Sequence, residues 1–258
     1  MKHRVGLAIG AAAGTAALLA LAPLVGSAAT SGQPRAVSVE LPFKVSELFF
    51  ELNNTDGDLG VHAKIDGVDW KQLWITSPQE RVLFQVQTRG GIRQQGLNEI
   101  FFESAEPDFS ELPPAQFFQR FPEGVYEFEA TTIDGEELSG EATVSHVLPA
   151  PAVALFPAST CAAPATVAGP VTIRWAAVTR SHPTVGTPGQ PIDVERYELA
   201  LERLDSTVLK MSIDLPPNVT SFTVPSNFTG APGTVKFQIL VKARNGNRTG
   251  QEGCFTVG

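Results

Sequence analysis

Short runs in which apolar and polar residues alternate are the feature that most restricts the fold of this chain. Residues 61–65 alternate valine, alanine and isoleucine with histidine and lysine, and a later run has Tyr126, Phe128 and Ala130 at every second position. A period of two places apolar side chains on one face of a β-strand. The chain also has 23 glycines and 20 prolines among 258 residues, which favours many turns over long helices. The sequence therefore predicts an all-β protein.

Two tight hairpins are predicted in the first half of the chain. Asp134-Gly135 separates the strand through Phe128 from returning apolar residues that begin at Leu138. Asp66-Gly67 stands between the alternating run 61–65 and a further apolar run. Asp-Gly pairs are typical of two-residue hairpin turns, so we expect both to reverse the chain.

One short helix is predicted over residues 113–121, because it starts with two prolines and is followed by a proline and a glycine. Its three phenylalanines are three and four residues apart, so two of them can face a core: Phe117, Phe118 and Phe121. This spacing favours a lid over one open end of the core, with a ligand-clamping aromatic flap as the alternative.

A proline-rich seam divides the sequence into two blocks. The first block runs over residues 37–147 and the second over residues 153–258, while residues 148–152 alternate prolines with small residues. Such a composition fits a short, semi-rigid linker. Each block has about the 100 residues of a β-sandwich domain, which predicts two sandwiches in tandem with the helix in the first.

The start of the chain has the pattern of a secretory signal peptide over residues 1–29. Basic residues at positions 2–4 precede an uncharged run over 5–24 and small residues at 26–29. We expect cleavage to leave a mature chain that starts near Thr30. An uncleaved membrane anchor is the alternative, because the apolar run is long enough to span a bilayer. Cleavage would leave no membrane span, so we expect an extracellular or periplasmic location.

The charge balance excludes nucleic acid as an expected partner. There are 27 acidic and 19 basic residues, which gives a formal net charge of −8. A chain of this sign repels a phosphate backbone. Its only small basic patch runs from Arg89 to Arg93, and the glycines within it indicate a hairpin loop.

The second block resembles a fibronectin type III domain. The segments that carry the resemblance match that family's second, third, fifth and sixth strands: Val171–Trp175, Arg196–Leu201, Thr220–Val224, and Pro232-Gly233-Thr234 followed by the alternating run to Asn245-Gly246. Phe237 stands where the family usually has tyrosine, so the hydroxyl of a tyrosine corner is missing there. The first block is similar only over residues 122–128, which have the same proline–glycine–aromatic order.

The whole chain resembles bacterial secreted proteins that carry fibronectin type III domains. The resemblance implies tandem immunoglobulin-like sandwiches that act as spacers or binding modules. We therefore expect a non-catalytic binding or structural protein of the cell envelope or extracellular space, whose partner is an unknown protein or saccharide. The alternative is an accessory or carbohydrate-binding module of a polysaccharide-acting hydrolase system, since fold alone does not assign function.

Cys161 and Cys254 are expected to form a disulfide. Cys161 precedes the second strand of the second block and Cys254 lies in its last strand. The first and last strands of a sandwich can be neighbours, and exported proteins meet an oxidising environment. Two buried free thiols are the alternative.

A dense group of oxygen-bearing side chains occupies residues 53–58. Asn54, Asp56 and Asp58 alternate and could direct three ligands at a hard cation such as calcium. The segment is not an EF-hand loop, because Leu59 and Ile65 stand where the glycine and the bidentate glutamate are required. A polar turn is the alternative, since Asn, Asp and Gly tolerate unusual dihedrals. No other cofactor is expected.

No catalytic centre is expected. The three histidines beyond the export segment are far apart and belong to no metalloprotease or serine-hydrolase motif, which indicates surface histidines: His62, His146 and His182. Trp70 and Trp74 are four residues apart, so on one continuous strand they would share a face. That face is either core or an exposed platform for a saccharide.

Overall fold

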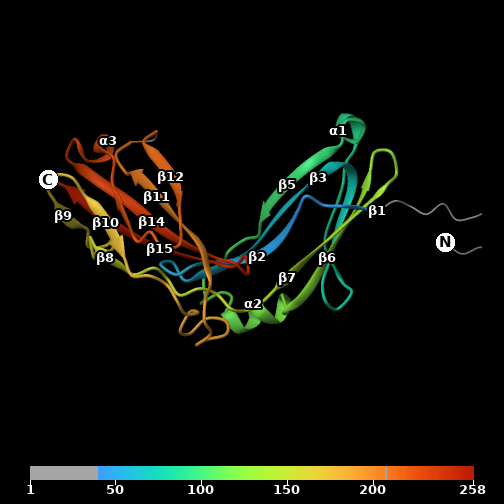
Figure 1. Ribbon diagram of the computed structural model, residues 1–258, viewed down its shortest axis with the longest axis horizontal. Coiled ribbons are helices and arrows are strands. Elements are labelled where there is room, and N and C mark those ends of the chain that lie inside the picture. Colours follow the sequence, from blue (N-terminus) through green and yellow to red (C-terminus); the bar gives the residue numbers. More distant parts are fainter. Residues whose placement is uncertain (1–39, 207) are drawn as a thin grey trace, which may run out of the picture. The chain divides into compact units, whose positions relative to one another are not determined.

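The structure, a computed structural model, describes residues 40–206 and 208–258, which are mostly β-strand (Figure 1). The export segment expected over residues 1–29 lies outside the described residues, as does Thr30. Within the described ranges no helix is long and apolar enough to cross a membrane. The elements follow in the order β1 (Glu40–Pro42), β2 (Val45–Asn53), β3 (Asp58–Thr76), β4 (Val82–Gln87), α1 (Gly90–Gln95), β5 (Leu97–Glu103), α2 (Pro114–Arg120), β6 (Gly124–Thr132), β7 (Glu137–Val144), β8 (Ala154–Phe156), β9 (Ala165–Val167), β10 (Thr172–Trp175), β11 (Val194–Arg203), β12 (Lys210–Leu215), β13 (Ser221–Thr223), α3 (Ser226–Thr229), β14 (Gly233–Ala243) and β15 (Arg248–Val257).

The long strand β3 builds the first sandwich because its two parts pair with different strands. Residues 58–66 pair with β2 and residues 70–76 with β6, while β5 pairs with residues 62–66 and with Trp70, and β4 pairs with residues 72–76. The hairpin expected at Asp66-Gly67 is wrong, since the chain continues there as one irregular strand. A Cβ at Gly67 would lie 2.9 Å from Leu138 Cδ2, so this glycine permits a close approach of the bend to β7 rather than a turn.

The alternating runs place their apolar residues in the first core, as predicted. Val61, Ala63 and Ile65 of β3 are each at most 2% exposed and pack with Tyr126 and Phe128 of β6. The hairpin at Asp134-Gly135 is confirmed, because β6 and β7 pair antiparallel across this turn. Burial of these rows supplies most of the driving force for folding.

The predicted helix is confirmed as α2, and its phenylalanines pack on the core. Phe117 is 2% exposed and its ring meets Phe50 edge-on at 5.2 Å between centroids. The short helix α1 was not predicted, and the expectation of a hairpin loop from Arg89 to Arg93 is wrong. Adjacent glycines disfavour helix intrinsically, so the local sequence gave no helix signal.

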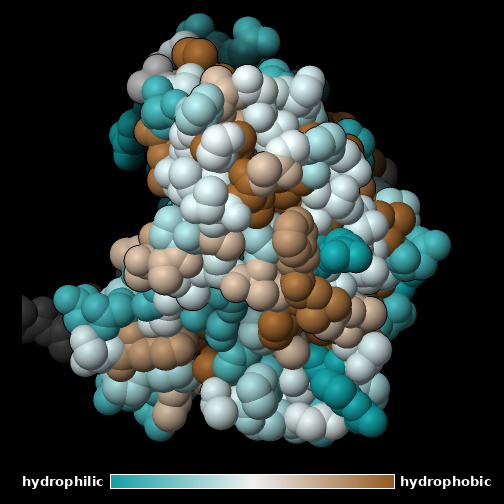
Figure 2. All heavy atoms as spheres, turned by 90° about the vertical axis from the view of Figure 1, so that its left-hand side faces the viewer, coloured by the Kyte–Doolittle hydropathy of each residue, from teal (hydrophilic) through white to brown (hydrophobic). Residues whose placement is uncertain are grey.

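The second sandwich has the two-sheet arrangement expected from its resemblance to a fibronectin type III domain, with β9 added to the larger sheet beside β15. One sheet has the order β13-β10-β8, and the other contains β15, β14, β11 and β12 in antiparallel order. Trp175 of β10 is 2% exposed and meets Tyr197 of β11 edge-on at 5.5 Å. Both halves are therefore all-β sandwiches. On the face of the second one shown in Figure 2, apolar residues gather in several groups between polar ones.

A tyrosine corner is present in the first sandwich. Tyr126 Oη donates a hydrogen bond of 3.0 Å to the carbonyl of Pro122, and Gly124 starts the strand with a φ of 139°. In the second sandwich the strand starts at Gly233, with a φ of 152°, so Val235, and not Phe237 as expected from the sequence, stands at the position of Tyr126. In place of a tyrosine hydroxyl, the Arg203 guanidinium donates hydrogen bonds to three backbone carbonyls of that corner: Phe228, Ala231 and Pro232.

Strands β2 and β15 pair in parallel and join the two sandwiches through one twelve-stranded sheet. The proline-rich segment 148–152 is buried at both of its ends. Leu148 belongs to the first core and Ala152 to the second, each at 0% exposure. The assignment of residues 37–147 and 153–258 to two domains stays a prediction.

Candidate functional site

A row of polar and aromatic side chains crosses four strands beside the β2–β15 pairing. Leu48, Phe50 and Leu52 of β2 point into the first core, so Phe49 and Glu51 point away from it. The strand register then places the outward residues side by side: Arg248 opposite Glu51, Phe49 opposite His62, and His62 opposite Glu103.

Aromatic rings hold the His62 imidazole in this row. The ring stacks on Phe49 with centroids 5.4 Å apart, and Phe101 lies 6.0 Å away. Arg248 Cζ lies 3.7 Å from the centre of the Phe49 ring, a cation–π contact. The expectation of a surface histidine is wrong here: His62 faces outward from β3, but it is only 4% exposed because these neighbours cover it.

Glu106, from the segment after β5, completes a group of possible metal ligands. Its Oε1 lies 3.0 Å from His62 Nε2. The ligand atoms of His62, Glu103 and Glu106 all lie within 4.8 Å of one another. A side chain at position 60 would collide with the Glu106 carboxylate, so Gly60 supplies the space that Glu106 occupies.

Negative charge exceeds positive charge around this group. Burial raises the pKa of Glu51, and the nearby His62 and Arg248 partly offset that effect. The pKa of Asp58 is raised to about 6, first by burial and then by the charges of Glu106 and other carboxylates. Asp58 Oδ1 is buried and has no hydrogen-bond partner. The surroundings therefore disfavour the ionised forms of Glu51 and Asp58.

The three residues considered for calcium do different things in the structure. Asn54 donates to Gln251 Oε1 at 2.6 Å and accepts from His182 Nε2 at 2.8 Å. Asp56 accepts from Asn53 at 2.8 Å within the turn, while Asp58 begins β3 beside the Glu106 charge. These contacts favour the polar-turn alternative, and calcium binding by Asn54, Asp56 and Asp58 stays a prediction.

The structure keeps the other two histidines in separate places. His182 is 5% exposed, so the expectation of a surface histidine is wrong here too, and its Nδ1 accepts from the backbone N–H of Thr184 and Val185. Burial lowers the pKa of His182, so the ring is neutral and Nε2 carries the proton that it donates to Asn54. His146 Nε2 lies 2.9 Å from the Phe121 carbonyl. Both of these imidazoles link segments of the fold.

The two tryptophans of β3 lie on opposite sides of the sheet. An irregularity of the pairing follows Trp70, which is 0% exposed in the core. Trp74 is half-buried between the core residues Leu73 and Ile75, so it faces outward. The expectation of a shared face is therefore wrong. Trp74 lines a hollow of about 210 Å³ whose other polar side chains are largely acidic: Glu40, Glu129 and Glu137.

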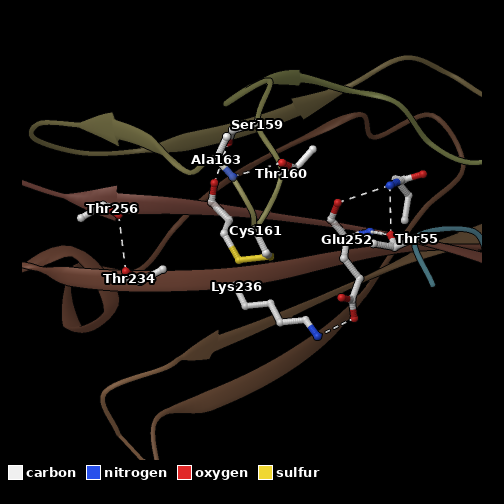
Figure 3. The surroundings of a disulfide bond; sticks show 11 residues. Thr55, Ser159, Thr160, Cys161, Ala163, Thr234, Lys236, Glu252 and Thr256 are labelled. Atoms are coloured by element: carbon white, nitrogen blue, oxygen red, sulfur yellow. Dashed lines mark hydrogen bonds and ion pairs between the residues drawn. A yellow bond between two sulfur atoms is a disulfide. The ribbon is translucent and has the colours of Figure 1, made fainter.

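The expected disulfide between Cys161 and Cys254 is present, with their Cα atoms 4.6 Å apart (Figure 3). Ser159 Oγ donates to the Cys254 carbonyl at 2.6 Å, so the segment before β9 is fixed to β15 twice. Two residues earlier on β15, the backbone N–H of Glu252 donates to Thr55 Oγ1 at 2.8 Å. The last strand thus holds both the disulfide and the turn over residues 53–58.

Comparison with known proteins gives no family for this chain. No protein-family model and no curated protein matches it. Solved structures with detectable similarity include a tetra-tandem repeat in the extending region of a large adhesion protein, at 11% identity, TM-score 0.27 and coverage of 83% of this chain and 50% of that chain. The human OSCAR ligand-binding domain has 14% identity, TM-score 0.25 and coverage of 81% and 97%. The chicken CNTN1 FN1–FN3 domains have 9% identity, TM-score 0.29 and coverage of 83% and 65%.

This chain spans half the length of the adhesion-protein structure. Each TM-score is below 0.5, so the fold assignment rests on the strand pairing described above. The outward row on β2, β3, β5 and β15 was not found from the sequence. The spacing of His62, Glu103 and Glu106 follows no known motif, and only the pairing of β3 with β5 brings them together.

Proposed function

We propose that this chain is a secreted, non-catalytic β-sandwich protein that binds or holds a partner in the cell envelope or extracellular space. The export pattern over residues 1–29 and the disulfide between Cys161 and Cys254 support an oxidising compartment. The proposal includes a mature chain that starts near Thr30.

The observation that carries the proposal is the hydrogen-bonded junction between the sandwiches. Asn247 is 1% exposed, and its Nδ2 donates to the Ser145 carbonyl at 2.7 Å while its Oδ1 accepts from the Phe50 N–H at 3.0 Å. Thr249 is 0% exposed and donates to the Pro149 carbonyl at 2.7 Å. Buried, fully paired polar groups resist hinge motion. A connected pair of sandwiches of this kind suits a scaffold that presents surfaces to a partner.

The test combines processing with binding. The full chain is produced in a secreting host, and intact mass is measured on the exported protein, with a mature start near Thr30 and no free thiol as the expected result. The purified protein is then sedimented with isolated cell envelopes, where we expect saturable binding. Retention of residues 1–29, absence of binding, or turnover of hydrolase substrates that is lost in a histidine-to-alanine variant would overturn the proposal.

A second candidate, a saccharide-binding module, is favoured by the hollow beside Trp74. The partly buried Trp74 with its neighbouring carboxylates offers a stacking surface and hydrogen-bond acceptors for sugar hydroxyls. A Trp74→Ala variant should then lose retention on insoluble polysaccharides such as chitin or peptidoglycan. A Phe101→Ala variant, which removes another exposed aromatic ring from the same domain, serves as the matched control. Equal retention of both variants would argue against this candidate.

A further inference from the structure

We propose that His62, Glu103 and Glu106 bind a divalent transition-metal ion of the zinc class on the outward face of β3 and β5. Two of these ligands are directly opposite each other in the β3–β5 register, and the third comes from the segment that follows β5. This site goes beyond the proposed function and does not depend on it.

The distances between the ligand atoms fit such an ion. The three atoms lie within 4.8 Å of one another, and His62 Nε2 is 3.0 Å from Glu106 Oε1. Two tetrahedral ligands at zinc bond lengths of about 2.0–2.2 Å lie roughly 3.3–3.6 Å apart. Modest rotation of the two glutamates would therefore place all three ligands at bonding distance, with water in the fourth position.

The chemical types of the three ligands also favour a zinc-class ion over calcium. One imidazole and two carboxylates suit zinc and its neighbours, whereas calcium takes six to eight oxygen ligands. When the metal binds Nε2, the neutral imidazole carries its single proton on Nδ1, and Nε2 exchanges its contact with Glu106 for the metal bond.

Two features outside the ligand set point to a cation at this place. Asp58 Oδ1 is buried without a hydrogen-bond partner, close enough to Glu106 for the two charges to interact. A bound cation would relieve the repulsion of Glu106 by Asp58 and by the neighbouring Glu103. His62 is in addition held between aromatic rings, and Gly60 leaves room for Glu106, so two of the ligands are already positioned.

The test uses the mature full chain without a histidine tag, stripped of metal with a chelator. Zinc titration by calorimetry should give one site, with a Kd of about 10 µM or tighter. Zinc should also raise the Tm by mass action.

Three variants locate the site. Glu103→Gln removes an exposed ligand without loss of side-chain volume, and we expect at least a tenfold weaker affinity with an apo-protein Tm no lower than that of the unaltered protein. Gly60→Ala displaces the Glu106 carboxylate while all three ligands remain, and we expect a similar loss. Glu99→Gln, an exposed glutamate on the same strand that pairs with Lys64, should bind zinc like the unaltered protein.

Zinc binding that is absent, or equally strong in Glu103→Gln and Gly60→Ala, would overturn the proposal. A rise in Tm with calcium but not zinc that is lost in Asp56→Asn would also overturn it, and would assign the cation to the turn over residues 53–58 instead. His62→Gln is a further variant, and its circular-dichroism spectrum separates loss of the ligand from loss of the fold.

Discussion

At the scale of single residues, burial decides which side chains contribute most to stability and which carboxylates resist ionisation. Trp175 fills the second core against Tyr197, whereas Trp74 lies half-buried on an outward face. The fold opposes the ionisation of Asp58, since its Oδ1 is buried without a hydrogen-bond partner and other negative charges are nearby. The first residue-scale prediction concerns packing and the second concerns charge.

Trp175→Ala should lower the free energy of unfolding by roughly 3–5 kcal/mol, because it removes a large side chain and leaves a cavity. Urea denaturation followed by circular dichroism measures the change. Trp74→Ala is the matched control and should cost less, since that ring already contacts solvent. A Trp175→Ala protein as stable as the unaltered chain would show that β10 does not carry the core.

Asp58 should make stability fall as pH rises from about 4 to about 7 in metal-free protein. Its pKa is raised from 3.8 to about 6 in the folded state, so the folded state holds the proton more tightly than the unfolded state does across this window. Asp58→Asn should remove this contribution and therefore gain stability relative to the unaltered protein with increasing pH. Unfolding curves at several pH values, with Asp134→Asn at an exposed turn as the control, measure the difference. A constant difference between Asp58→Asn and the unaltered protein would contradict the prediction.

At the scale of elements, the last strand β15 connects three other strands, and its own sequence pattern does not show which ones. It pairs with β14, β2 and β9, and it carries Cys254. The bent strand β3 has the corresponding role in the first sandwich, since it pairs with β2, β4, β5 and β6. The disulfide is the element-scale feature that a simple experiment can remove.

The double variant Cys161→Ala, Cys254→Ala should lower the free energy of unfolding by roughly 2–4 kcal/mol. The bond joins residues 93 apart in the sequence, so its loss increases the conformational freedom of the unfolded chain. Chemical denaturation of the variant, and of the unaltered protein with and without reductant, measures the effect. Two thiols that react in the denatured but unreduced protein would show that the bond does not form.

At the scale of the whole molecule, two hydrophobic cores share one continuous sheet. The first core contains Phe50 and Leu148, the second contains Ala152 and Trp175, and the pairing of β2 with β15 lies between them. Separate cores favour independent folding, while the shared sheet and the buried Asn247 couple the two halves.

A fragment of residues 151–258 should fold and melt cooperatively, because it contains the complete second core and the disulfide. Its Tm should be lower than that of the mature chain, since Asn247 and Thr249 lose their partners in residues 145–149. Differential scanning calorimetry measures both. A fragment without a cooperative transition would show that the halves fold only together, and would remove the boundary at residues 148–152.

The sequence by itself determined the local features of this protein. Alternation identified the strands through Val61 and Phe128, the Asp134-Gly135 pair identified a hairpin, and the flanking prolines identified α2. Each of these depends on residues close together in the chain, where side-chain period and turn preference decide the outcome.

Only the tertiary structure decided which strands lie side by side. Alternation showed that His62 faces away from the core, but it held no information on the β3–β5 register that places Glu103 opposite it. The same holds for the bend of β3 at Gly67 and for the pairing of β15 with β2. Such contacts join residues up to about two hundred positions apart, and they are set by the packing of whole layers rather than by any local preference.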